Sequence, residues 1–185
     1  MLEELKKCVK SRLNNKVFDI VVYGSLVKGK YEPEDIDMAV IFKDGLLNER
    51  LEIIQQIKRR IKIDNKIDIK GFLLADLFKP EFFGRSGIFF EGISLIDGKP
   101  FSNKIGFNGV VIFFYNLKNK NHTEKVKFNY LLSGRKNKEG LIKLFEGKQL
   151  APGVFKLPIK NSIKFEEVLK KNEIFYSKIN TLIMN

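Results

Sequence analysis

Apolar positions in the first hundred residues shift repeatedly between helical and strand-like spacing. Apolar residues three or four positions apart predict helices, and runs rich in Val, Ile and Phe predict strands. The expected helices span residues 2–13, 46–62 and, in two pieces broken near Pro80 and Gly84, 75–95. The expected strands span residues 17–23, 36–42 and 67–74, before a short edge hairpin over 94–101. This order indicates a mixed sheet flanked by helices, in the α/β (α+β) class.

A second, smaller α+β module is expected after a linker over residues 101–108. Its predicted strands span 109–117, 154–159 and 174–183, and its predicted helices span 123–133, 141–145 and 162–171. In the first of these helices, Val126, Tyr130 and Leu131 are expected to form the apolar side. We therefore expect two domains, 1–103 and 104–185.

Charge separates the same two parts of the chain. The 185 residues carry a formal charge of +12. Residues 1–103 hold 18 Lys and Arg against 16 Asp and Glu, whereas residues 104–185 hold 16 against 6. A basic module beside a near-neutral one favours a polyanionic partner for the basic part. The alternative is a generally lysine-rich surface without a specific partner.

Composition alone argues against several classes of protein. The longest apolar run, Val110 to Tyr115, has six residues, whereas a membrane-spanning helix needs roughly 20. The charged first fifteen residues show no secretory signal. Cys8 is the single cysteine, so neither a disulfide framework nor a cysteine zinc site is expected. We therefore expect a cytoplasmic protein with no membrane partner.

The residues with the clearest chemical pattern follow the first predicted strand. Gly24-Ser25 is separated by nine residues from Asp35, and Asp37 follows two positions later. Residues two apart on a strand point to the same face, about 6–7 Å apart. Two carboxylates at that distance repel each other unless a cation lies between them, and Mg²⁺ prefers such oxygen ligands together with phosphates. A glycine and a hydroxyl at a strand-to-helix turn suit a phosphate.

If the second and third predicted strands are neighbours, Asp68 on the third can supply a third carboxylate on the same face. Three acidic groups with two Mg²⁺ ions, or Mn²⁺ in their place, would support two-metal phosphoryl transfer. Lys28 is a candidate contact for the triphosphate, and Lys70 shares the side of Asp68. The competing interpretation is that these are solvated surface charges at strand ends.

This arrangement resembles the DNA polymerase β-like nucleotidyltransferase superfamily, in particular its small members. The family motif is Gly-Ser, a spacer of about ten residues and Asp-x-Asp between apolar residues, with a third acidic residue on a later strand. Gly24, Ser25, Asp35, Asp37 and Asp68 match it position by position, and Lys28-Gly29 resembles the basic residue and glycine that often follow. The resemblance covers about residues 15–100. It implies a palm-like fold, Mg²⁺ and an NTP, with ATP the expected nucleotide.

The acceptor of the nucleotide stays open among three alternatives. Arg135, Lys136 and Lys138 form a dense basic turn, and Phe128 and Tyr130 are interleaved with the lysines upstream of it, which favours RNA or another nucleic acid. The alternative is a solvated helix face whose aromatic residues belong to the core. The resemblance also implies a protein acceptor, as in antitoxins that attach adenylate to a helical toxin. The third alternative is a non-catalytic nucleic-acid-binding protein.

Overall fold

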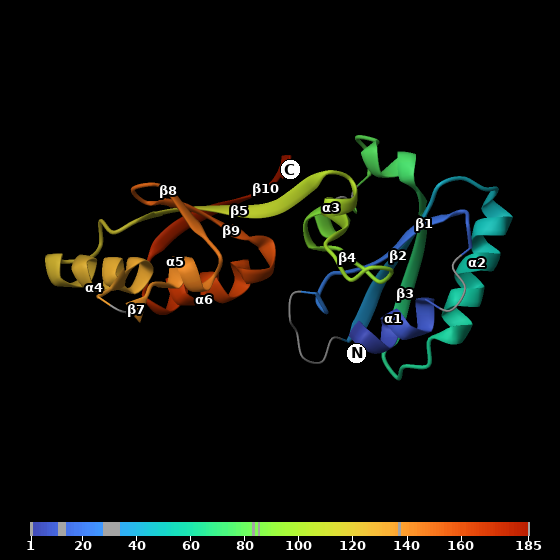
Figure 1. Ribbon diagram of the computed structural model, residues 1–185, viewed down its shortest axis with the longest axis horizontal. Helices are drawn as coiled ribbons and strands as arrows, with labels where there is room; N and C mark the ends of the chain where they lie inside the picture. Colours follow the sequence, from blue (N-terminus) through green and yellow to red (C-terminus); the bar gives the residue numbers. More distant parts are fainter. Residues whose placement is uncertain are drawn as a thin grey trace. The chain divides into compact units, whose positions relative to one another are not determined.

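The computed structural model describes residues 2–10, 14–27, 34–82, 84, 86–136 and 138–184. The chain divides into two compact units, Met1–Gly106 and Phe107–Asn185 (Figure 1). Each unit has its own sheet and its own hydrophobic core, so each is described by itself. Catalysis and substrate binding, the roles expected for the two parts, remain predictions.

The N-terminal unit is built on a mixed sheet of four strands. Its strands are β1 (Val17–Tyr23), β2 (Asp35–Phe42), β3 (Lys66–Leu73) and β4 (Ile93–Ser94). They lie in the order β3-β2-β1-β4, and only the pair β2 and β3 is parallel. The helix α2 (Leu47–Arg60) connects these two parallel strands, as a parallel connection requires. The predicted fold class, a mixed sheet flanked by helices, is confirmed.

One face of this sheet carries the main core. Every second residue of β2, from Ile36 through Met38 to Val40, is fully buried there. The helices α1 (Leu2–Lys10) and α2 supply Leu5 and Ile57, among others, to the same cluster. Because side chains alternate along a strand, Asp35 and Asp37 lie on the opposite face. The two aspartates therefore lie on the more open face, where Asp35 is exposed and Asp37 is half-buried.

A buried ion pair lies on the same face of the sheet as Asp35 and Asp37, at the other end of β1. Asp19 on β1 is fully buried, and Lys104 places its Nζ 2.8 Å from the Oδ2 of Asp19. The Ser94 hydroxyl and the Ile20 amide both donate to the Asp19 Oδ1 at 2.7 Å. Burial raises the pKa of Asp19, whereas the hydrogen bonds from Lys104 and Ser94 lower it. The group therefore ties β1 to β4 and to the segment that contains Lys104.

The segment that ends the N-terminal unit differs from the prediction. The sequence predicts a linker over residues 101–108, but Phe101–Lys104 is the short helix α3, and Phe101 is fully buried. The Phe101 ring stacks on Phe89 at 5.9 Å between centroids. The two helical pieces expected over 75–95 are a 3₁₀ turn, η1 (Leu74–Phe78), and a π turn, η2 (Gly87–Glu91). The linker prediction was wrong because Phe101 packs into the core of the unit.

The C-terminal unit has an antiparallel sheet with all three of its α-helices on one side (Figure 1). Its main strands are β5 (Phe107–Asn116), β8 (Lys148–Ala151), β9 (Val154–Pro158) and β10 (Phe175–Met184). The helices are α4 (His122–Ser133), α5 (Leu141–Leu144) and α6 (Ser162–Lys171), with a 3₁₀ turn η3 (Ile159–Asn161) and a hairpin of β6 (Gly134–Arg135) and β7 (Lys138–Glu139). The strand order β10-β5-β9-β8, with α4 and α6 as crossovers, is the split β-α-β arrangement of ferredoxin-like domains.

The core of this unit is rich in phenylalanine. Phe113 and Phe155 stack at 5.5 Å between ring centroids, and Phe165 of α6 lies 4.6 Å from Phe155. From α4 the core takes Phe128 and Leu132. The predicted apolar side of this helix was wrong, because Tyr130 and Leu131 are about half-exposed and Val126 is only half-buried. In the described part of the chain, no helix is long and apolar enough to cross a membrane.

Candidate functional site

The three predicted carboxylates share one face of the N-terminal sheet. In the parallel register of β2 and β3, Asp37 lies directly beside Asp68. Asp35 lies two residues earlier on β2 and therefore points to the same side. The structure thus brings the three residues together as the spacing predicted.

Tyr23, which the sequence did not single out, lies on the same patch of sheet. It is the last residue of β1 and pairs with Asp37. Burial raises the pKa of its hydroxyl, Lys70 lowers it, and the charges of Asp37 and Asp68 raise it again, so all four groups are neighbours. The signal available in the sequence was its position directly before Gly24 at the end of a strand. Only the register of β1 against β2 shows which carboxylate it accompanies.

Gly24 brings the main chain against the carboxylate of Asp37. Its φ is +77°, a conformation that glycine adopts without strain. A Cβ at this position would lie 2.5 Å from the Oδ2 of Asp37. The main chain at Gly24 therefore lies against Asp37, and the predicted approach of Gly24-Ser25 to a phosphate stays a prediction.

The other residues predicted to bind a phosphate, Ser25 and Lys28, lie only in part within the described residues. Residues 24–27 form a turn, and Ser25 is half-buried within it. No helix begins within these four residues, so the expected helix N-terminus is not found in this segment. Lys28 lies outside the described residues.

The carboxylates of Asp35, Asp37 and Asp68 repel one another across this patch. Burial, then the charges of Asp35 and Asp68, raise the pKa of Asp37, and Lys70 acts in the opposite direction. The Lys70 ammonium lies 3.1 Å from the Oδ2 of Asp68, and the hydrogen bond to Asp68 raises the pKa of this lysine. Lys66 lies beside Asp35 in the same register, so two lysines of β3 face three carboxylates among the described residues, and the patch keeps a net negative charge.

Comparison with known families agrees with this geometry. Residues 3–90 match the family model described as polymerase beta, nucleotidyltransferase. This match places the N-terminal unit among the polymerase beta-like nucleotidyltransferases. The matched segment contains β1, β2 and β3 and all three carboxylates, and it ends before the C-terminal unit begins. No curated protein matches the chain.

Nucleotidyltransferases of this family typically use divalent metal ions, so we tested the donor set for that role. Within the described residues, no three His, Cys, Asp or Glu side chains are already arranged as a metal site. The donors nevertheless fit a hard cation, since all three are carboxylates on adjacent strands and two of them raise the pKa of the third. Asp35, Asp37 and Asp68 are the residues that could hold such an ion.

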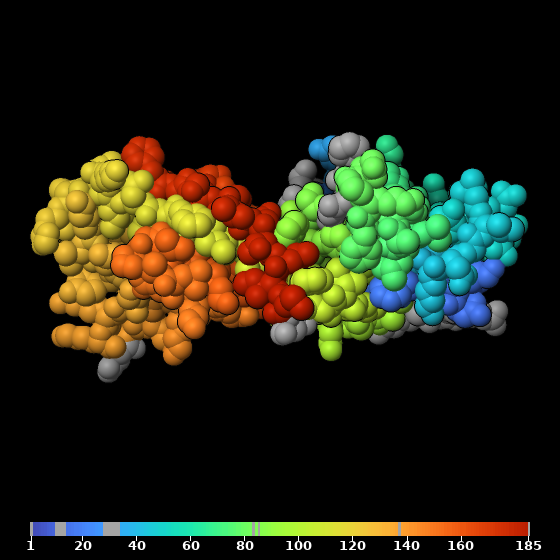
Figure 2. Space-filling model, turned by 90° about the horizontal axis from the view of Figure 1, so that it is seen from above, coloured from blue at the N-terminus to red at the C-terminus, as the bar shows by residue number. Residues whose placement is uncertain are grey.

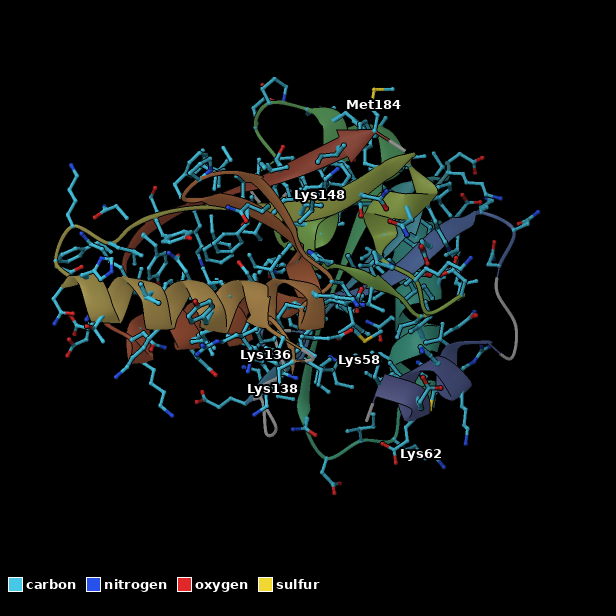
Figure 3. All side chains as sticks on the ribbon, turned by 60° about the vertical axis from the view of Figure 1, so that its left-hand side comes forward. Lys58, Lys62, Lys136, Lys138, Lys148 and Met184 are labelled. Carbon is cyan, nitrogen blue, oxygen red and sulfur yellow. The ribbon has the colours of Figure 1, made fainter. Side chains whose placement is uncertain are left out.

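The basic turn of the C-terminal unit is the hairpin of β6 and β7. Arg135, Lys136 and Lys138 are exposed on it, and Figure 3 labels the two lysines there. The Arg135 guanidinium stacks 4.8 Å from the centre of the Tyr130 ring. Of the two alternatives for Phe128, the core aromatic is confirmed, since its side chain is buried. The hairpin therefore presents cations with one half-exposed ring.

A hollow of about 470 Å³ also lies in the C-terminal unit, near the end of β5. Its lining combines apolar residues with uncharged polar ones such as Asn116, Asn129 and Gln149. Among the described residues that line it, none is charged, so it lacks the groups that would hold a phosphate.

Proposed function

We propose that this protein is a Mg²⁺-dependent nucleotidyltransferase that moves a nucleoside monophosphate from an NTP to an acceptor hydroxyl, with RNA as the acceptor. The observation that carries the proposal is the cluster of Asp35, Asp37 and Asp68 beside the main chain at Gly24. This cluster lies inside the segment that matches the nucleotidyltransferase family.

Each residue of the cluster has a chemical role in this proposal. Asp35 and Asp37 hold the metal ions, and Asp68 is the third ligand and accepts the proton of the attacking hydroxyl. The backbone at Gly24, the Ser25 hydroxyl and Lys28 hold the triphosphate. Bound Mg²⁺ neutralises phosphate charge and lowers the pKa of the acceptor hydroxyl. The new bond joins the acceptor oxygen to the α-phosphorus, and pyrophosphate leaves.

The choice of RNA rests on the charge of the second unit. Arg135, Lys136 and Lys138 are exposed on one hairpin, and residues 104–185 hold 16 basic against 6 acidic side chains. Cations arranged in this way attract the phosphates of a nucleic acid. Nothing comparable in the described part of the unit favours a helical protein as the acceptor.

The test is transfer of label from each α-labelled NTP to total RNA in the presence of Mg²⁺. The wild type should label RNA, and the preferred NTP identifies the base. Asp35→Ala combined with Asp37→Ala should remove the label while the circular dichroism spectrum is kept, because both positions lie on the side of β2 that points away from the core of the N-terminal unit.

Two other results would redirect the proposal. Label on a co-expressed protein rather than on RNA would replace the acceptor and keep the catalytic site. RNA binding without any Mg²⁺-dependent NTP binding would indicate a non-catalytic nucleic-acid-binding protein instead.

A further inference from the structure

In the described part of the C-terminal unit, no element covers the sheet face that points away from the helices. In Figure 1 the helices α4, α5 and α6 lie below the strands, and Figure 2 looks onto the unit from above, where β10 (red) lies uncovered. We call this surface the open sheet face, and the residues of interest on it are Phe114, Lys148, Lys156, Phe175, Ser177 and Ile179. These residues alternate with those that enter the core.

Two aromatic rings stand on this face close to each other. Phe114 pairs with Ser177, and Asn116 pairs with Phe175, so the two phenylalanines are diagonal neighbours on adjacent strands. Diagonal neighbours lie about 7–8 Å apart. Phe114 is 37% exposed and Phe175 is 62% exposed, and neither belongs to the core. The rings are therefore available to a ligand.

Two lysines stand on the same face in an unfavourable arrangement. Lys148 of β8 lies directly opposite Lys156 of β9. Like charges directly opposite each other destabilise a strand pair. Among the described residues, neither lysine forms an ion pair. The pair is a position where an anion would relieve the repulsion.

Acidic side chains are absent from the open sheet face as the described residues define it. The six acidic residues of the unit lie on helices, on the small hairpin or in turns. They are Glu124, Glu139, Glu146, Glu166, Glu167 and Glu173. Of these, Glu166 is engaged by Tyr176 and Lys178 on the helical side of the sheet. The open sheet face therefore carries Lys148 and Lys156 with no acidic side chain beside them, although most basic residues of the unit lie elsewhere.

We propose that the open sheet face binds single-stranded RNA, with bases stacked on Phe114 and Phe175 and phosphates held by Lys148 and Lys156. Stacking on aromatic rings and neutralisation of phosphates are the two requirements of single-strand binding. A second copy of this chain is a poorer occupant, because a symmetric contact would bring no carboxylate to the lysines. The choice of RNA rests on the proposed function.

This face is separate from the basic hairpin that the sequence indicated. Lys148 lies apart from Lys136 and Lys138 in Figure 3. The hairpin presents three cations and one ring, whereas the open sheet face presents two rings and two cations. RNA binding at the hairpin and RNA binding at the open sheet face would therefore be weakened by different substitutions.

The first experiment measures fluorescence anisotropy of labelled ten-nucleotide oligouridylate and oligoadenylate with the full-length protein, in EDTA and without NTP. Phe114→Leu and Phe175→Leu should each weaken binding about fivefold or more, since base stacking is lost while apolar surface is kept. Phe175→Tyr should bind as the wild type does. Leu144→Ala, at a position 60% exposed on α5, is the matched control and should also bind normally.

The second experiment measures the salt dependence of the same binding. Lys148→Gln with Lys156→Gln should lower the slope of log affinity against log salt by about 0.7 for each lysine. Lys164→Gln with Lys171→Gln removes the same charge from α6, on the other side of the sheet, and should leave the slope unchanged.

Three results would overturn the inference. Leucine variants that bind as well as the wild type would show that no base stacks there. Equal slopes for the two lysine pairs would show diffuse attraction only. A shift in mass by light scattering in the Phe175→Leu variant would identify the face as a contact between copies. RNA binding that survives Asp35→Ala with Asp37→Ala separates this inference from a failure of the catalytic proposal.

Discussion

Gly24 meets two constraints at one position, and they can be separated experimentally. Its φ of +77° strains any side chain, and a Cβ would also meet the Asp37 carboxylate at 2.5 Å. Gly106 has only the first constraint, because its φ is +86° but a Cβ there would meet no described atom within 4 Å. We expect Gly106→Ala to cost about 1–2 kcal/mol in urea denaturation. Gly24→Ala should cost more and should also weaken NTP binding.

NTP binding by the Gly106→Ala variant is the control for this prediction. Gly106→Ala should bind NTP as the wild type does, because its neighbourhood is open. Equal effects of the two alanine variants on stability and on NTP binding would show that contact with Asp37 plays no part.

Lys104 gives a second prediction at the residue scale. Its ammonium compensates the fully buried Asp19, so Lys104→Met would leave a buried charge without its cation. Removing one partner of a buried pair costs roughly 3–5 kcal/mol. Lys79→Met breaks the exposed pair with Asp76, at 2.6 Å, and should cost less than about 1 kcal/mol. Urea denaturation of both variants checks the difference, and equal losses would contradict it.

At the scale of elements, Glu166 joins α6 to β10. It accepts a hydrogen bond from the Tyr176 hydroxyl at 2.6 Å and another from Lys178. Burial raises the pKa of Glu166, but these hydrogen bonds and the charge of Lys178 outweigh it and lower the pKa to about 2. A lowered pKa means that the ionised form is bound more tightly in the folded state.

The resulting pH dependence has a definite sign. The stabilisation by Glu166 should be complete above its ordinary pKa of 4.5 and be lost as the pH falls toward about 2. Glu166→Gln should therefore be less stable than the wild type at pH 6, and the difference should shrink between pH 4.5 and 2. Glu167→Gln, at the next and exposed position of α6, is the control. A difference that does not change with pH would contradict the role of the carboxylate charge.

The elements that the sequence predicted are those with apolar periodicity of their own. The strands that became β1, β2 and β3 have strong runs of Val and Ile, and their bounds agree within about a residue. The edge strand β8 was missed because three of its four residues, Lys148, Gln149 and Ala151, carry no strand signal and gain their order from pairing with β9. Without β8, the split β-α-β arrangement of the second unit was not visible.

The candidate site likewise has a part that the sequence predicted and a part that only the fold shows. The shared face of Asp35 and Asp37 followed from their spacing along one predicted strand, because alternation is a local property. The placement of Asp68 beside them depends on the pairing of β2 with β3. The contact of Gly24 with Asp37 and the placement of Tyr23 depend on how β1 pairs with β2. The burial of Asp19 and Phe101 likewise depends on packing between distant segments, which no local pattern reports.

At the scale of the whole molecule, we place the chemistry in one unit and binding of the acceptor in the other. Chelation by EDTA should stop nucleotide transfer and leave the melting temperature nearly unchanged, since the strands that carry the carboxylates are held by sheet pairing and by the Lys70–Asp68 contact. Added Mg²⁺ should restore transfer. A large fall in melting temperature on chelation would instead indicate a structural metal ion.

In the proposed function, the three carboxylates on one face of the N-terminal sheet form a site for Mg²⁺ and an NTP. Equilibrium dialysis of each NTP with and without Mg²⁺ tests it without knowledge of the acceptor. We expect Asp35→Asn, Asp37→Asn and Asp68→Asn each to weaken Mg²⁺-dependent binding at least about tenfold. Asp64→Asn, an equal charge change at an exposed position just before β3, should have no effect. Unchanged binding in the Asp37→Asn variant, or an equal loss in Asp64→Asn, would contradict the account.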